Sequence, residues 1–298
     1  MALHGISRII LGVPNVETTG EYYEAFGLAP LGEHRFGTVE GGHQLTLVET
    51  PKRQLKEICI GADAAEDLLA IGERLVRLDA PLRLESDALH TAEPVSGTAI
   101  SVRIAPRIEQ RAAAAPRLNL PGRYARPNER IDAFYRTGPV KPRKLGHVVL
   151  GSSNAKVTRA FFIDGLGFKA SDTVNGVGTF MRCSTEHHNV FLLESNVDFM
   201  HHTGWQVEDV DEVGRGATHM IKRNGETHVW GLGRHYIGSN FFWYLQDPAG
   251  NFVEYYADMD HIEEHFGWVE GIQKTGLGWG LKPPHTFTNP MDLAGFEG

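Results

Sequence analysis

The chain repeats itself at an offset of 139 residues, from Ile6 to Leu145, and this duplication limits its fold more than any other feature. In both copies an apolar run ends in glycine and a turn, and a helix with paired aromatic residues follows. One extra residue precedes Gly167-Phe168 in the second copy. The matching segments are 6–15 with 145–154, 21–28 with 160–168, 58–77 with 203–221, and 98–104 with 251–257. The period is far too long for a solenoid, so we expect two similar domains.

Each half alternates strands and helices in an order that predicts an α+β fold. It reads as strand, helix and further strands, with a second helix between strands and short Gly/Pro turns. The Pro- and Arg-rich stretch between the halves reads as an irregular linker, and the Gly/Pro-rich end of the chain as a tail that covers a surface or an opening. The predicted division is an N-terminal domain 1–109, a linker 110–143, a C-terminal domain 144–265 and a tail 266–298.

Composition excludes several classes of protein. Of 298 residues, 41% are hydrophobic and 22% charged, which is ordinary for a globular protein. A net charge of -8 disfavours a role in coating nucleic acid. No run approaches the roughly 18 apolar residues of a membrane span, and the N-terminus does not resemble a signal peptide. Two cysteines, Cys59 and Cys183, suit a reducing compartment, so we expect a soluble cytoplasmic protein without membrane or nucleic-acid partners.

The histidines point to a metal site in the second half, because eleven of the 15 lie between His147 and His285. His147, His202 and Glu254 each occur in a strand-like run, and they can meet only if their strands converge in one curved sheet. A carboxylate in an apolar strand is costly unless a partner such as a divalent cation neutralises it. Two histidines and one carboxylate form the facial triad of non-haem Fe(II) oxygenases.

Other interpretations of these residues stay open from spacing alone. A strand histidine is often an ordinary core or surface residue, and a strand glutamate often pairs with lysine or arginine. His201 competes with His202, since strand geometry places the two on opposite faces. The first half has Arg8, roughly Glu57, and Ser101 at the matching positions. That set is a poor cage for a divalent ion, so we expect only the second domain to bind metal.

The duplicated βαβββ halves and the set His147, His202 and Glu254 resemble the vicinal oxygen chelate superfamily. More narrowly, the chain is similar to the type I extradiol catechol dioxygenases, of the 2,3-dihydroxybiphenyl 1,2-dioxygenase and catechol 2,3-dioxygenase kind. The likeness covers about residues 5 to 268 in architecture and is specific from about 144 to 257. It implies two vicinal-oxygen-chelate domains, each of paired βαβββ modules that form a curved, partly open barrel. The second ligand in that family is the latter histidine of a His-His pair, which selects His202 over His201.

The resemblance also implies helpers, a metal and partners. His188 of the pair His187-His188 falls where the family keeps its acid/base histidine. His235, in Gly233-Arg234-His235, falls where a histidine contacts substrate, and Tyr244 where the family has a pocket tyrosine. The implied cofactor is Fe(II), with Mn(II) as the other ion that suits such a site. The implied activity is extradiol cleavage of a catechol-type diol by O2, in a homo-oligomer.

Each alternative function predicts a different use of the same residues. A lyase or isomerase of the glyoxalase type is expected to use four protein ligands, often across paired domains. A 4-hydroxyphenylpyruvate dioxygenase shares the His-His-Glu set but not the arrangement of His188, His235 and Tyr244. A non-catalytic binding protein of the superfamily has no use for the three ligands. The linker and the tail carry no motif, so the ring substituent of the substrate is left open.

Overall fold

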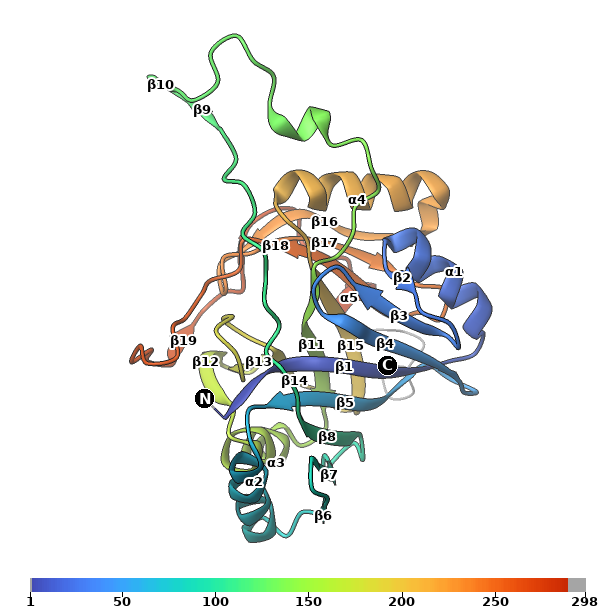
Figure 1. Cartoon of the computed structure of the whole chain (residues 1–298), viewed down its shortest axis with the longest axis vertical. Helices are drawn as coiled ribbons and strands as arrows, with labels where there is room; N and C mark the ends of the chain where they lie inside the picture. The colour runs from blue at the N-terminus through green and yellow to red at the C-terminus, as the bar shows by residue number, and fades with distance from the viewer. Residues whose placement is uncertain (1, 289–298) are drawn as a thin grey trace.

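The computed structural model describes residues 2–288, and two large sheets follow the two copies of the repeat (Figure 1). The first sheet has eight strands in the order β2-β3-β4-β1-β5-β8-β7-β6. The second has ten strands in the order β19-β12-β13-β14-β11-β15-β18-β17-β16-β20. Without its outer strands β19 and β20, the second sheet repeats the order of the first when β11–β18 are matched to β1–β8. The predicted α+β duplication is therefore confirmed, with open curved sheets in place of closed barrels.

The strands and helices have the following bounds. The first sheet contains β1 (Leu3–Val13), β2 (Ala29–Pro30), β3 (Arg35–Thr38), β4 (Gly42–Glu49), β5 (Gln54–Ala62), β6 (Arg83–Leu84), β7 (Ala88–Ala92) and β8 (Ala99–Ile104). The second contains β11 (Lys144–Ser152), β12 (Lys169–Val174), β13 (Gly178–Arg182), β14 (Val190–Glu194), β15 (Phe199–Gln206), β16 (His228–His235), β17 (Phe241–Gln246), β18 (Phe252–Ala257), β19 (Gly271–Gln273) and β20 (Leu277–Trp279). The helices are α1 (Val16–Phe26), α2 (Ala65–Arg77), α3 (Ala155–Ala160), α4 (Val210–Arg223) and α5 (His285–Thr288), with short helical turns η1 (Asp132–Tyr135), η2 (Phe161–Leu166) and η3 (Gly225–Thr227).

Each sheet consists of two βαβββ modules joined along their first strands. β1 pairs parallel with β4 and antiparallel with β5, and β5 pairs parallel with β8. The second sheet has the same pairings between β11 and β14, β11 and β15, and β15 and β18. This topology brings β11, β15 and β18 side by side, although they are far apart in sequence.

The structure shows where the second copy accommodates its extra residue. In the first copy α1 is 11 residues long, whereas in the second α3 and η2 contribute six residues each. The turn η2 is π-helical, and a π turn accommodates one inserted residue without displacing the elements around it. Both helices then end on glycine in the left-handed conformation, Gly27 with φ 106° and Gly167 with φ 92°.

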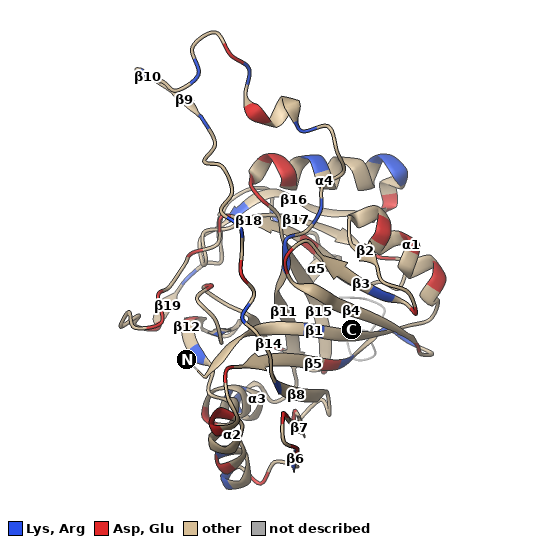
Figure 2. Cartoon of the chain, viewed as in Figure 1, with Lys and Arg blue, Asp and Glu red and all other residues tan. Residues whose placement is uncertain are grey.

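The two halves share one hydrophobic core. Phe26 of α1 stacks on Tyr255 of β18 with ring centroids 3.9 Å apart. Arg74 of α2 donates hydrogen bonds to the carbonyls of Gly165 and Leu166, at the end of η2. Acidic and basic residues intermix along the outer faces of α2 and α4 (Figure 2), as expected for helices that bury only one face.

The linker and the tail behave differently from each other. Part of the linker forms a two-stranded ribbon, β9 (Asn119–Leu120) and β10 (Arg123–Tyr124), that projects away from the sheets (Figure 1). The tail returns to the second sheet, where β19 pairs with β12 and β20 with β16. Among the described residues, no helix has the length and apolar character needed to cross a bilayer. The exact domain boundaries stay a prediction.

The prediction that His201 and His202 lie on opposite faces is wrong, because the side chains do not alternate regularly along β15. Val149 of β11 pairs with His202, whereas the next residue, Leu150, pairs with Met200. His201 therefore has no partner in this ladder and forms a β-bulge, which re-aims side chains. His201 and His202 do not lie on opposite faces: their Nδ1 atoms are 2.8 Å apart and both rings line the same cavity.

Candidate metal centre and active site

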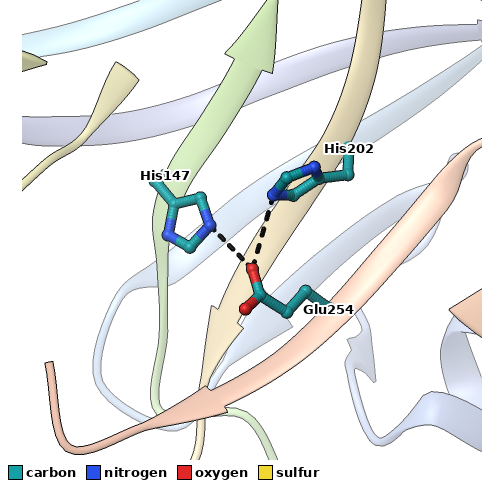
Figure 3. Close-up of side chains that lie close together, drawn as sticks. All are labelled: His147, His202 and Glu254. Atoms are coloured by element: carbon teal, nitrogen blue, oxygen red, sulfur yellow. Dashed lines mark hydrogen bonds and ion pairs between the residues drawn. The ribbon is translucent and has the colours of Figure 1, made fainter. Parts of the chain in front are cut away.

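Three neighbouring strands bring the predicted ligands together (Figure 3). His147 lies on β11, His202 on β15 and Glu254 on β18. One potential ligand atom from each residue falls within a group whose members all lie within 4.8 Å of one another. Oε2 of Glu254 is 2.8 Å from Nε2 of His147 and 3.4 Å from Nε2 of His202. These three residues are the metal-ligand candidates that the sequence predicts.

The chemistry of this donor set fits a divalent cation. The exposed fractions of His147, His202 and Glu254 are 1%, 6% and 0%. Burial lowers the pKa of His147 to about 4 and that of His202 to about 3, so both imidazoles are neutral near pH 7. A neutral imidazole has the free lone pair that a metal ligand needs. Two imidazoles and a carboxylate are the donors that non-haem Fe(II) uses, and Mn(II) accepts the same set.

Gly204 makes room for the first ligand. On β15, Gly204 pairs with His147 of β11 on one side and with Glu254 of β18 on the other. A Cβ added to Gly204 would lie 2.1 Å from Cε1 and 2.3 Å from Nε2 of His147. Only glycine leaves space for the imidazole at this position, so Gly204 shapes the centre although it offers no ligand atom.

The first sheet has different groups at the equivalent positions. Arg8 pairs with Cys59, and Cys59 with Ser101, as His147 pairs with Gly204 and Gly204 with Glu254. Glu57 stands opposite Ile10, as His202 stands opposite Val149. Both the Arg8 guanidinium and the Ser101 hydroxyl donate to Sγ of Cys59, at 3.3 and 3.1 Å. The strand register thus agrees with the equivalence that the repeat predicts.

A cavity of about 1060 Å³ is lined by the three ligand candidates and by the three other predicted site residues, His188, His235 and Tyr244. The ring of His188 is 4.6 Å from that of His147, measured between centroids. The ring of Tyr244 is 5.0 Å from that of His202. His235 lies beside Tyr244, with Nε2 2.9 Å from the phenol oxygen. All six predicted site residues therefore face one space.

Hydrogen bonds assign the protons of His235 and Tyr244. Nδ1 of His235 lies 3.3 Å from the carbonyl oxygen of Gly276, which can only accept, so Nδ1 carries the proton. Burial lowers the pKa of His235, which keeps the ring neutral and leaves Nε2 as an acceptor for the Tyr244 hydroxyl. Burial also raises the pKa of Tyr244 well above its usual value. Tyr244 is therefore a neutral phenol that donates to His235.

The structure adds site residues that the sequence interpretation missed. Nε2 of His201 donates to the carbonyl of Phe287 at 2.6 Å, so its Nδ1 accepts from Nδ1 of His202. This fixes the tautomer of His202 with the Nε2 lone pair toward Glu254, as hydrogen-bond partners of metal-binding histidines commonly do. Asn240 donates to Oε1 of Glu254 at 3.2 Å. Phe287 belongs to the motif-free tail, so no local pattern signals its place here.

Aromatic side chains line parts of the cavity. Phe180 and Phe191 stack with centroids 3.8 Å apart and planes 4° from parallel. The edge of Phe180 meets His188 at 5.0 Å. Phe287 packs against His202 and Tyr244 from the side of the tail. Stacked aromatic rings of this kind suit a flat, largely apolar ligand.

The fold and the site indicate the superfamily that the sequence resembles, and comparisons with known proteins agree. A profile of the Glyoxalase/Bleomycin resistance protein/Dioxygenase superfamily matches residues 144–255, the part that holds all six site residues. Among solved structures, the Mn(II)-bound glyoxalase from Novosphingobium aromaticivorans superposes with a TM-score of 0.76 at 23% identity, over 96% of this chain and 94% of that one. This likeness shows that the two chains share a fold.

The curated relatives establish the family within that class. Metapyrocatechase 2 of Cupriavidus necator is 31% identical over 302 aligned residues, which cover 96% of this chain and 92% of that protein. An iron-dependent extradiol dioxygenase of Rhodococcus jostii (strain RHA1) is 24% identical over 151 residues, 46% of this chain and 50% of the relative. The chain belongs to the extradiol dioxygenases, a family of ring-cleaving oxidoreductases.

Proposed function

We propose that this chain cleaves a catechol-type diol with O2, using Fe(II) held by His147, His202 and Glu254. The observation that carries the proposal is the convergence of these three donors on the wall of the cavity that also contains His188. When bound, Fe(II) would supply a Lewis-acidic and redox-active centre for the reaction of the diol with O2. Mn(II) suits the same donors.

His188 is the proposed acid and base. Its neutral ring lies against that of His147, so a diol oxygen bound at the metal site would come within its reach. The imidazole takes a proton from a diol hydroxyl and later returns it to an oxygen of the opening ring. Its pKa is lowered by burial, which keeps the free ring unprotonated and able to accept that proton.

His235 and Tyr244 position the diol from the side of His202. Tyr244 pairs in register with Glu254 on the adjacent strand, so its phenol lies beside the ligands. Its hydroxyl, held by His235, presents a polar group to the ring oxygens while the aromatic walls hold the ring plane. The size of the cavity and the Phe180–Phe191 pair favour a substituted catechol over catechol itself.

The finer statements about partners and location are also proposals. Both cysteines are free thiols, as expected in a reducing cytoplasm. The homo-oligomer that the resemblance implies can be checked by light scattering of the purified chain.

The test is a ring-cleavage assay after anaerobic loading with Fe(II). With 2,3-dihydroxybiphenyl or 3-methylcatechol, addition of O2 should give a yellow product and consume O2. Glu254→Gln should retain no iron and give no colour, while the matched control Glu57→Gln, on β5 of the first half, should behave as wild type. Yellow product from Glu254→Gln, or none from wild type that holds ferrous iron with either diol, would refute the proposal. The second result would favour a lyase or isomerase.

A further inference from the structure

A buried chain of hydrogen bonds leads away from His188 on the side opposite the cavity. Nδ1 of His188 lies 3.1 Å from Nδ1 of His187, and Nε2 of His187 lies 2.8 Å from Oδ2 of Asp172. All three side chains are at least nine-tenths buried, with His187 fully inaccessible. Of these three residues, only His188 takes part in the proposed proton transfer.

If Asp172 is a carboxylate, the hydrogen bonds determine which ring nitrogens of His187 and His188 carry protons. A carboxylate only accepts hydrogen bonds, so Nε2 of His187 must carry a proton and donate it. In a neutral His187 the other nitrogen, Nδ1, is then an acceptor. The proton between the two rings must therefore belong to Nδ1 of His188. This leaves Nε2 of His188 as a lone pair, with no protein partner among the described residues.

Independent contacts hold Asp172 ionised and in place. Gln273, on the tail strand β19, donates to Oδ1 of Asp172 at 3.0 Å. Burial opposes ionisation of this carboxyl, but the hydrogen bonds from His187 and Gln273 outweigh it and lower the pKa of Asp172. The tail therefore contributes to the state of the carboxylate through the pairing of β12 with β19.

The ring of His187 has little freedom to turn. Its backbone N–H donates to the carbonyl of Asp260 at 2.9 Å. The rings of Trp268 and Phe180 meet it edge-on, with centroids 5.9 and 5.8 Å away. Turning the imidazole over would break both of its hydrogen bonds inside a close-packed region, which is costly for buried polar groups.

We propose that Asp172 and His187 are positioning residues, which hold His188 in the tautomer whose unprotonated Nε2 faces the substrate and which balance the charge that His188 gains. The inference rests on the proposed function only in giving His188 its task. A diol O–H bond breaks and an N–H bond forms at Nε2, so His188 becomes an imidazolium. Its Nδ1 proton stays hydrogen-bonded to His187, and the carboxylate beyond lowers the energy of the positive ring. When Nε2 returns the proton, the starting tautomer is restored.

The direct test is nitrogen-15 NMR of the histidine rings in the full chain, loaded with diamagnetic Zn(II). Two-bond correlations show which nitrogen of His188 is protonated. His187→Phe removes the acceptor, whereas His187→Asn offers an amide oxygen near the position of Nδ1. Asp172→Asn still accepts from His187 but removes the charge. Asp79→Asn, an exposed acid on the first half, is the control.

Wild type, Asp172→Asn and His187→Asn should show His188 protonated at Nδ1, and His187→Phe should lose that preference. In the iron-loaded enzyme, His187→Phe and Asp172→Asn should lower kcat about 10- to 100-fold at nearly constant KM, as loss of a supporting hydrogen-bond partner commonly does at a metal site. His187→Asn should recover part of the kcat lost in His187→Phe. A wild-type spectrum with the proton on Nε2, or an unchanged tautomer in His187→Phe, would overturn the inference. The spectra need no turnover, so they decide the tautomer of His188 even if the ring-cleavage assay fails.

Discussion

Replacing Gly204 with alanine should weaken metal binding without unfolding the chain. The added methyl would lie 2.1 Å from Cε1 of His147, a distance that carbon atoms do not tolerate. His147 is 1% exposed but lines the cavity, so the free space beside its ring is that of the cavity. In the metal-free chain the imidazole can relieve the overlap by tilting away from Glu254. The metal-bound chain lacks this freedom, because Nε2 must point at the ion.

The size of the effect follows from the cost of overpacking. One extra carbon in a close-packed interior typically costs about 1–3 kcal/mol. If the metal-bound state carries this cost, the Kd for Fe(II) rises about 5- to 150-fold, since about 1.4 kcal/mol changes an affinity tenfold. Secondary structure should be unchanged, because the backbone of Gly204 has no conformation reserved for glycine.

The assay is anaerobic titration with Fe(II) against a competing chelator, with circular dichroism to verify folding. Gly61→Ala is the matched control, since its Cβ would meet the ring of His4 at 2.2 Å on β5 of the first sheet. His4 is only partly buried and lines no part of the cavity. A wild-type Kd in Gly204→Ala, or an equal loss of affinity in Gly61→Ala, would refute this reasoning.

Four further substitutions test separate parts of the account. His202→Ala should abolish iron retention, whereas His188→Ala should keep the iron and lose turnover; equal iron loss by elemental analysis would contradict the assignment. Phe287→Ala should lower stability by about 3 kcal/mol, the cost of emptying a buried aromatic position, and an unchanged Tm would show that the tail does not pack on the site. The hydrogen bond from Arg107 lowers the pKa of Glu264 to about 2, so this carboxylate stabilises the fold above its unfolded pKa of about 4.5 and loses that contribution as pH falls toward about 2. Glu264→Gln should flatten the acid limb of a denaturation curve between those values, and an unchanged curve would exclude this pair as its source.

The sequence predicts the architecture well because the repeat carries it. Apolar runs that follow in the same order in the two copies determine which strands are equivalent, and the observed strand orders agree. The six site residues line one cavity. Their individual catalytic roles and the domain boundaries stay predictions.

What the sequence could not give depends on departures from regular geometry and on distant contacts. Strict alternation along β15 separates His201 from His202, but a single unpaired residue reverses that conclusion. The contact from Phe287 to His201 spans 86 residues, and Asp172 reaches His187 across 15. No local pattern encodes either contact, because each depends on how a loop or tail returns to the sheet.

The most direct test of the central claim is turnover in heavy-isotope dioxygen. The iron-loaded chain would be mixed with 2,3-dihydroxybiphenyl under labelled O2, and the product analysed promptly by mass spectrometry. Extradiol cleavage predicts a ring-opened product that carries both labelled oxygen atoms. A product without label, or a quinone formed by simple oxidation, would contradict the account.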